Sequence, residues 1–102
     1  MSKRGTIVSN EDFEKTTHWK TEIPFNTSLS ELFFTSKSEG GTTLEDGMFD
    51  PTGLFKIQIN DCVKLLINPN DDAMKSIKLS NFEVNKITIY GQGVSFYYYG
   101  VI

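Results

Sequence analysis

The chain has 102 residues, of which 38% are hydrophobic, 13% aromatic and 23% charged, and its formal net charge is −3. This length predicts a single domain over residues 1–102, and the apolar content excludes a disordered chain. One alanine against ten threonines, nine isoleucines and five valines excludes a helical bundle and favours strands. Neither half of the chain is strongly basic and no window is apolar enough to span a bilayer, so we expect neither nucleic-acid nor membrane binding.

The N-terminal segment gives weak local signals. We expect residues 1–8 to form an extended arm without the features of a signal peptide. Ser9 or Asn10 is a suitable cap for a short helix through residues 11–15, whose acidic residues fall in the first turn.

Two strands are expected next. Residues 18–23 alternate, which places Trp19 and Ile23 on one side, and Pro24 either ends the strand or marks a sheet edge. Residues 31–36 follow a segment that fits a helix capping box, but their aromatic and β-branched composition favours a strand.

Residues 37–51 form a long connection without apolar periodicity. Its large apolar residues are Leu44, Met48 and Phe49. Such loops in small domains are typically functional, mobile or ordered by a partner, so we expect a contact element here.

The clearest pattern covers residues 55–67. Phe55, Ile57 and Ile59 alternate with polar residues, and a second alternating run places Val63, Leu65 and Ile67 inward. The turn residues Asn60 and Asp61 between them tolerate positive φ, so the pair predicts a tight hairpin.

The segment after this hairpin is dense in turn formers. Residues 73–75 are expected to add one helical turn, and residues 76–79 to start a short strand. Phe82 and Val84 are expected to fill the core.

The C-terminal segment predicts a second hairpin. Residues 86–90 and 94–99 both alternate, and Gly91-Gln92-Gly93 between them is suited to a compact hairpin loop. Ile87 and Ile89 face inward from the first strand, as do Val94, Phe96 and Tyr98 from the second; Tyr97 and Tyr99 are left on the opposite face. The apolar end of the chain is expected to be tied into a sheet of this subunit or of a neighbour.

No catalytic or metal-binding set is evident. His18, the single histidine, is interpreted as a surface residue of a strand, and Cys62, the single cysteine, as a small apolar filler in a chain made in a reducing compartment. The acidic clusters at residues 45–50 and 68–72 lack the spacing of a calcium loop. We therefore expect no enzyme activity, no metal and no cofactor.

One family resemblance bears on function. Residues 76–91, followed by Val94-Ser95-Phe96-Tyr97-Tyr98-Tyr99-Gly100, resemble the closing hairpin of small virion proteins of tailed bacteriophages, with short Ile/Thr-rich strands, a glycine turn and an aromatic last strand. The resemblance covers about the last quarter of the chain. It implies a β-sandwich subunit of a capsid, neck, tail or decoration structure, and it carries over no functional residue.

These patterns predict an all-β fold: a compact antiparallel β-sandwich or barrel of about six to eight short strands, with at most one or two short helical turns. The expected function is that of a non-enzymatic virion structural protein of a tailed phage, made in the host cytoplasm, which forms a homo-oligomer or docks on other virion proteins. The candidate interface residues are Trp19, Tyr97, Tyr99, Val101 and Ile102.

The alternative is a small carbohydrate-binding module, in which Trp19, Tyr90, Tyr97 and Tyr99 would form a stacking platform and loop acids would hold hydroxyls or calcium. A glycan array would discriminate these two hypotheses. A small enzyme or an inhibitor of host enzymes is a third hypothesis, which the lack of a motif leaves open.

Overall fold

The computed structural model describes residues 7–37, 40–80 and 83–102. Residues 1–6, which make up most of the expected arm, and Phe82 lie outside the described residues. The described residues form eleven strands and no helix, which confirms the all-β class with more strands than expected because several have only two or three residues. The strands are β1 (Ile7–Ser9), β2 (Glu14–Lys15), β3 (Lys20–Leu29), β4 (Glu31–Lys37), β5 (Thr42–Thr43), β6 (Phe49–Asp50), β7 (Phe55–Ile59), β8 (Val63–Ile67), β9 (Ser76–Leu79), β10 (Val84–Tyr90) and β11 (Ser95–Val101).

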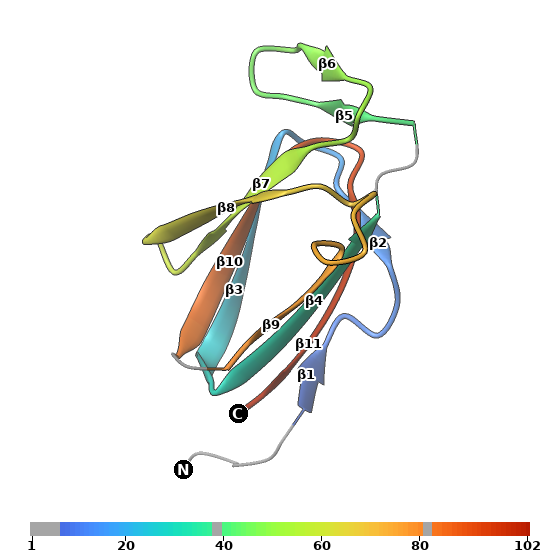
Figure 1. Ribbon diagram of the computed structural model, residues 1–102. Helices are drawn as coiled ribbons and strands as arrows, with labels where there is room; N and C mark the ends of the chain where they lie inside the picture. Colours follow the sequence, from blue (N-terminus) through green and yellow to red (C-terminus); the bar gives the residue numbers. More distant parts are fainter. Residues whose placement is uncertain (1–6, 38–39, 81–82) are drawn as a thin grey trace.

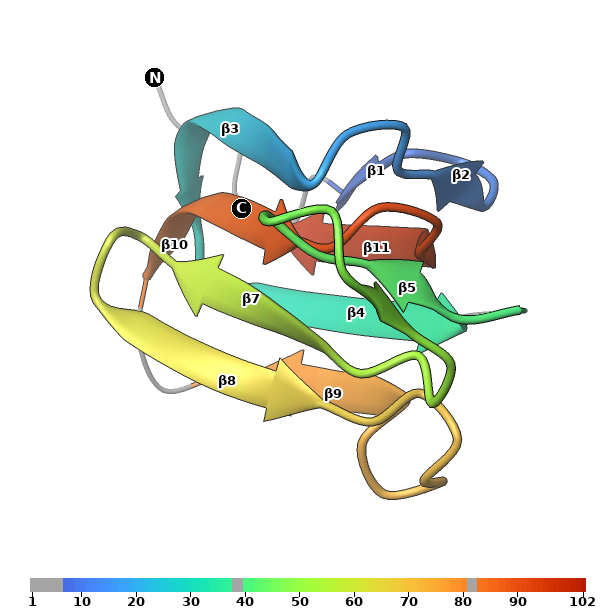
Figure 2. The same ribbon diagram turned by 90° about the horizontal axis from the view of Figure 1, so that it is seen from above.

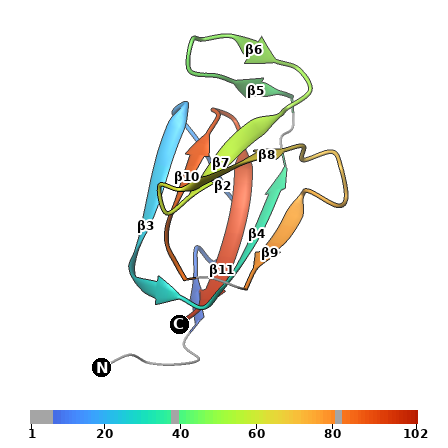
Figure 3. The same cartoon turned by 60° about the vertical axis from the view of Figure 1, so that its left-hand side comes forward.

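Two antiparallel sheets pack on each other as a sandwich (Figure 1, Figure 2). The five-stranded sheet has the order β1-β11-β4-β9, with β2 also paired to β11, and the four-stranded sheet has the order β3-β10-β7-β8. Figure 3 shows the two sheets approaching each other at the end where β3 turns into β4, and the small hairpin β5–β6 beyond the other end. The chain thus crosses from one sheet to the other between β3 and β4 at one end of the sandwich, and the hairpin β5–β6 lies beyond the other end.

The core follows from period-two alternation in both sheets. Phe55, Ile57 and Ile59 of β7 are at most 1% exposed, as the sequence predicts. The inward residues of the partner strands complete one cluster between the sheets. Its other members are Phe25, Leu29, Leu32, Phe34, Ile67, Val84, Ile87, Ile89, Val94 and Phe96.

The β7–β8 hairpin is confirmed, with Phe55 opposite Ile67 and Ile59 opposite Val63. Its tip contains Asn60 and Asp61 at φ values of 61° and 102°. The Asn60 side chain donates to the carbonyl of residue 83 at 2.7 Å and accepts from the N–H of residue 85 at 2.8 Å, which joins the hairpin to the start of β10. Val63 is 49% exposed rather than inward, because it lies at the end of an edge strand.

The prediction of a hairpin formed by β10 and β11 is wrong. The two strands lie in different sheets: β10 pairs with β3 and β7, whereas β11 pairs with β1, β2 and β4. Residues 91–93 therefore cross from one sheet to the other. Gly91 lies so close to β5 that a Cβ added to it would be 2.7 Å from Thr42 Cγ2.

Thr16 holds this crossover in place. Its hydroxyl is buried, donates to the carbonyl of Gly91 at 2.7 Å and accepts from the N–H of Val94 at 3.0 Å. Its backbone N–H donates to the Val94 carbonyl at 2.8 Å, and its carbonyl accepts from Gly93 at 3.0 Å. One residue thus bonds to both ends of the crossover, in place of the ladder that a hairpin would have formed.

The expected helix over residues 11–15 is also wrong. Glu14 and Lys15 form β2 on the edge of β11, and the preceding residues form a bend in which Glu11 has a φ of 65°. The Asn10 side chain, instead of capping a helix, accepts from the Tyr98 N–H at 3.0 Å and donates to the Phe96 carbonyl at 3.3 Å. This side chain bonds to β11 in the interval between β1 and β2.

Strands β3 and β4 are confirmed with changed details. β3 continues through Pro24 to Leu29, and Pro24 is tolerated because β3 is an edge strand. Trp19 and Ile23 do not share a face: Ile23 packs against the core, whereas Trp19 lies before the strand and contacts Tyr90.

The connection over residues 37–51 is only partly irregular. Thr42 and Thr43 pair with Asp50 and Phe49, and Thr43 also bonds to Gln92 of the crossover. After β8, the N–H groups of residues 74 and 75 both donate to the carbonyl of Asp71 at 2.9 Å, a single turn at the place where one helical turn is expected.

Candidate functional site

Aromatic rings cover part of the solvent side of the five-stranded sheet. Phe33 of β4 stacks on Tyr99 of β11, with ring centroids 4.5 Å apart and an interplanar angle of 14°. Tyr97 lies 6.2 Å from Tyr99, and Phe13, from the bend before β2, lies 6.0 Å from Tyr97. We call these four residues the aromatic face. Phe13 is 42% exposed and the other three are half-buried, so the rings form a continuous apolar surface that solvent reaches.

Two lysines flank the aromatic face. Lys37 Nζ lies 4.6 Å from the Phe13 centroid, and Lys78 Nζ lies 5.3 Å from the Phe33 centroid, both within cation–π range. Within the described ranges no carboxylate pairs with either ammonium group. Glu31 stands at the opposite end of β4 from Lys37, on the same face by strand parity, so the outer side of this strand is acidic at one end and basic at the other.

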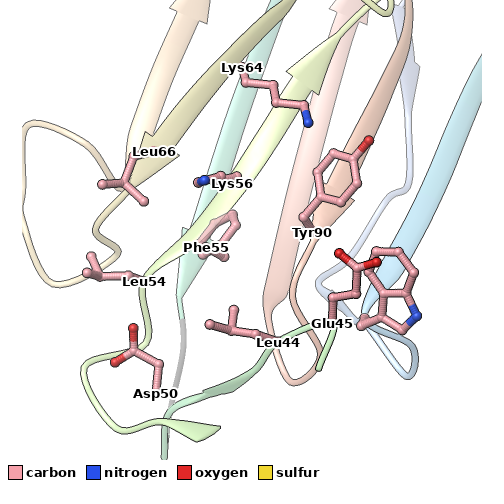
Figure 4. A pocket seen from close by; sticks show the side chains of 10 residues that line it. Leu44, Glu45, Asp50, Leu54, Phe55, Lys56, Lys64, Leu66 and Tyr90 are labelled. Carbon is pink, nitrogen blue, oxygen red and sulfur yellow. The ribbon is translucent and has the colours of Figure 1, made fainter. Parts of the chain in front are cut away.

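A separate pocket of about 350 Å³ lies on the solvent side of the four-stranded sheet. We call it the Trp19 pocket. Its aromatic lining residues are Trp19, Phe55 and Tyr90, and the Trp19 and Tyr90 ring centroids are 6.3 Å apart. Leu54 and Leu66 lie across Lys56 from Tyr90 (Figure 4). The hairpin β5–β6 and its loop add further lining residues, among them Leu44, Glu45 and Asp50.

The predicted interface residues therefore do not form one surface. Tyr97, Tyr99 and Val101 are alternate residues of β11 on the side opposite the core, and Val101 is half-buried opposite Ile7. Ile102 packs against the core instead. Tyr90 belongs to the other sheet and Trp19 lies beside it, just before β3, so the single four-ring platform of the carbohydrate hypothesis is divided between two faces.

Phe13 and Phe33 were not among the predicted interface residues. Phe33 had a usable signal, because inward Leu32 and Phe34 leave the residue between them on the solvent side. Phe13 had none, since its contact with Tyr97 depends on the pairing of β2 with the distant β11.

The chemically active residue types are dispersed. His18 is exposed, as expected, but it lies in the bend before β3 and not in a strand; its Nδ1 lies 3.1 Å from Thr17 Oγ1. Cys62 is exposed at the tip of the β7–β8 hairpin and is therefore no apolar filler. Across the described residues no three histidine, cysteine or acidic side chains gather as metal ligands would.

Burial raises the pKa of Tyr98, and the negative charge of Glu14 acts in the same direction. This tyrosine faces the interior, where its ring meets Phe25 edge-on at 5.3 Å.

No helix within the part of the chain that the structure describes is long and apolar enough to cross a membrane. Comparisons of the chain with protein-family models, with curated proteins and with solved structures found no match.

Proposed function

We propose that this chain is a non-enzymatic structural subunit that self-associates through the aromatic face. The observation that carries the proposal is the contact between four rings from three separate segments on the outside of a sheet whose other side already packs the core. Aromatic residues in contact on an accessible sheet surface are typical of protein interfaces.

A second copy is the occupant that the charges favour. Consider a symmetric dimer in which the five-stranded sheets of two copies pack face to face, with the twofold axis between the copies and perpendicular to the strands. Each β4 then runs antiparallel to the β4 of the other copy. Glu31 of one copy then lies at the end where Lys37 of the other copy lies, so each acidic end meets a basic end. The rings of both copies pack between these ends and lose their contact with water.

The test is sedimentation velocity of the purified chain over a range of concentrations. We expect a dimer that the double variant Tyr97→Ser/Tyr99→Ser converts to a monomer. The control is Met48→Ser, because Met48 is 65% exposed on the hairpin β5–β6, away from this face. A chain that stays monomeric at millimolar concentration contradicts the proposal, as does a dimer that the double variant leaves intact.

Charge reversal tests the orientation. Lys37→Glu should weaken the dimer by bringing two acidic ends together, and Glu31→Lys in addition should restore it. Equal affinities for the single and double variants would contradict the antiparallel arrangement.

The proposal places this subunit in the virion of a tailed phage, synthesised in the host cytoplasm. Its support is the sequence resemblance of residues 76–91 and 94–100 to the closing segments of such virion proteins, in their Ile/Thr-rich strand, glycine turn and aromatic last strand, together with the all-β sandwich. The support lies in this composition and not in a hairpin, because the two strands join different sheets. The corresponding test is mass spectrometry of purified particles of the phage that encodes the chain. Absence of its peptides from intact particles contradicts this placement and leaves the dimer test unaffected.

A further inference from the structure

The Trp19 pocket lies on the opposite sheet from the proposed dimer surface and has the features of a ligand site. Its volume of about 350 Å³ is near the lower end of the roughly 300–1,000 Å³ found for small-molecule pockets. A site of this size suits a ligand of one or two rings rather than a long polymer segment.

The aromatic part of the pocket is held in place before any ligand binds. Tyr90 donates its hydroxyl proton to Gln58 Oε1 at 2.9 Å, which fixes the direction of its ring. The backbone carbonyl of Trp19 accepts from the N–H of Gly91 at 2.7 Å, next to Tyr90 in the chain. The two rings are tilted by 32°, so they form a broad surface instead of stacking on each other. Because these two side chains lose little conformational freedom on binding, their surface is suited to packing against a flat apolar face of a ligand.

The two lysines of the pocket favour an anionic group on the ligand. Lys56 and Lys64 both line it, and no carboxylate in the described ranges forms an ion pair with either. Lys64 Nζ lies 5.0 Å from the Tyr90 centroid, so its charge is close to the ring surface where a ligand would pack. A carboxylate on the ligand is the natural partner of such ammonium groups.

Two acidic residues in the same pocket decide which kind of anion fits. Glu45 and Asp50 are acceptors, so they suit ligand hydroxyl groups and repel the closely spaced phosphates of a nucleic acid. The ligand therefore needs a ring with an apolar face, several hydroxyls and one carboxylate. A pyranose sugar acid combines these features, since its axial C–H groups pack on aromatic rings while its hydroxyls point outward.

We infer that the Trp19 pocket binds a sugar acid of the hexuronate type, with the ring against Trp19 and Tyr90, the carboxylate at Lys56 and Lys64, and hydroxyls at Glu45. Trp19 is the single tryptophan of the chain, so its fluorescence reports directly on the pocket. This inference does not depend on the proposed dimer.

The test is a fluorescence titration of the full chain with glucuronate and with a diglucuronate, checked by calorimetry. We expect saturable binding that Lys56→Gln and Lys64→Gln each weaken about tenfold or more, whereas glucose, which has the same ring without the carboxylate, binds at least tenfold more weakly. Both lysines are exposed, so neither variant should disturb folding. Lys75→Gln is the control, because Lys75 pairs with Asp72 and is not among the residues that line the pocket.

Three outcomes overturn the inference: no binding of either uronate at millimolar concentration, equal binding of glucose, or tighter binding of a thymidine oligonucleotide that displaces the uronate. Tyr97→Ser/Tyr99→Ser separates this inference from the proposed function. It should abolish the dimer and leave uronate affinity unchanged, and a joint loss would contradict the assignment of two independent surfaces.

Discussion

Thr16→Val tests whether the crossover between β10 and β11 depends on one buried hydroxyl. Valine has almost the same shape as threonine but can neither donate to the Gly91 carbonyl nor accept from the Val94 N–H. Thr16 is 4% exposed, so water cannot easily replace either bond. At about 1–3 kcal/mol for each of the two buried groups left without a partner, the substitution should lower the free energy of unfolding by roughly 2–6 kcal/mol.

Urea unfolding, followed by Trp19 fluorescence and by circular dichroism, measures this loss. The control is Thr16→Ser, which keeps the hydroxyl and removes one methyl group, at a cost of about 1 kcal/mol. The two backbone bonds of residue 16 to Gly93 and Val94 remain in both variants, so they cause neither loss. The loss in the valine variant reports on the hydroxyl, and the serine variant measures the cost of removing the methyl group. A valine variant as stable as the serine variant would refute this account of the crossover.

Two further predictions concern single side chains near the core. Ser36→Ala should raise the free energy of unfolding by up to about 1 kcal/mol in a urea titration, because the buried Ser36 Oγ has no hydrogen-bond partner within the described structure; a loss of stability would show that the hydroxyl is satisfied in solution. Tyr98→Phe should make the loss of stability above pH 10 less steep. Burial raises the folded-state pKa of Tyr98 above 10.0, so the folded chain holds this proton more tightly than the unfolded chain does. The stabilisation that the raised pKa of Tyr98 gives the folded state is therefore complete below pH 10, and it is lost as the pH rises toward the folded-state pKa. Unfolding midpoints from pH 8 to 12 check this, and identical profiles for the two proteins would contradict it.

Local alternation predicted the longer strands β3, β4 and β7 to β11, but neither the two- and three-residue strands nor the assignment of β10 and β11 to different sheets. Period-two patterning correctly placed Ile87, Ile89 and Phe96 inward, since a strand has only two faces. It cannot tell which of two sheets a strand joins, because residues facing the core from either sheet have the same pattern. A glycine-containing connection is equally suited to a hairpin and to a crossover. The crossover is bonded to Thr16, which lies 75 residues before Gly91 in the chain, and the two strands pair with β3 and β4, which are also distant in the sequence.

For the candidate sites too, local patterns predict which face a residue lies on, but not which distant residues it contacts. Tyr97 and Tyr99 could be assigned to an outer face from their spacing, whereas their contacts with Phe13 and Phe33 depend on strand pairing over long sequence separations. Local patterns could not predict the Trp19 pocket either, because its lining residues come from segments that are distant in the sequence. Trp19 was predicted on the side of Ile23, but the bend before β3 places it beside Tyr90 instead.

The short segment from Phe13 to Trp19 links the two surfaces. Phe13 contributes a ring to the aromatic face on one sheet, Trp19 contributes a ring to the pocket on the other, and Thr16 is anchored between them at the crossover. Because the solvent sides of the two packed sheets point in opposite directions, a dimer formed through the aromatic face leaves the Trp19 pocket of each copy open to solvent. A face-to-face pair would therefore present two pockets on opposite sides, so it could join two acidic glycan chains, whereas a monomer could hold only one.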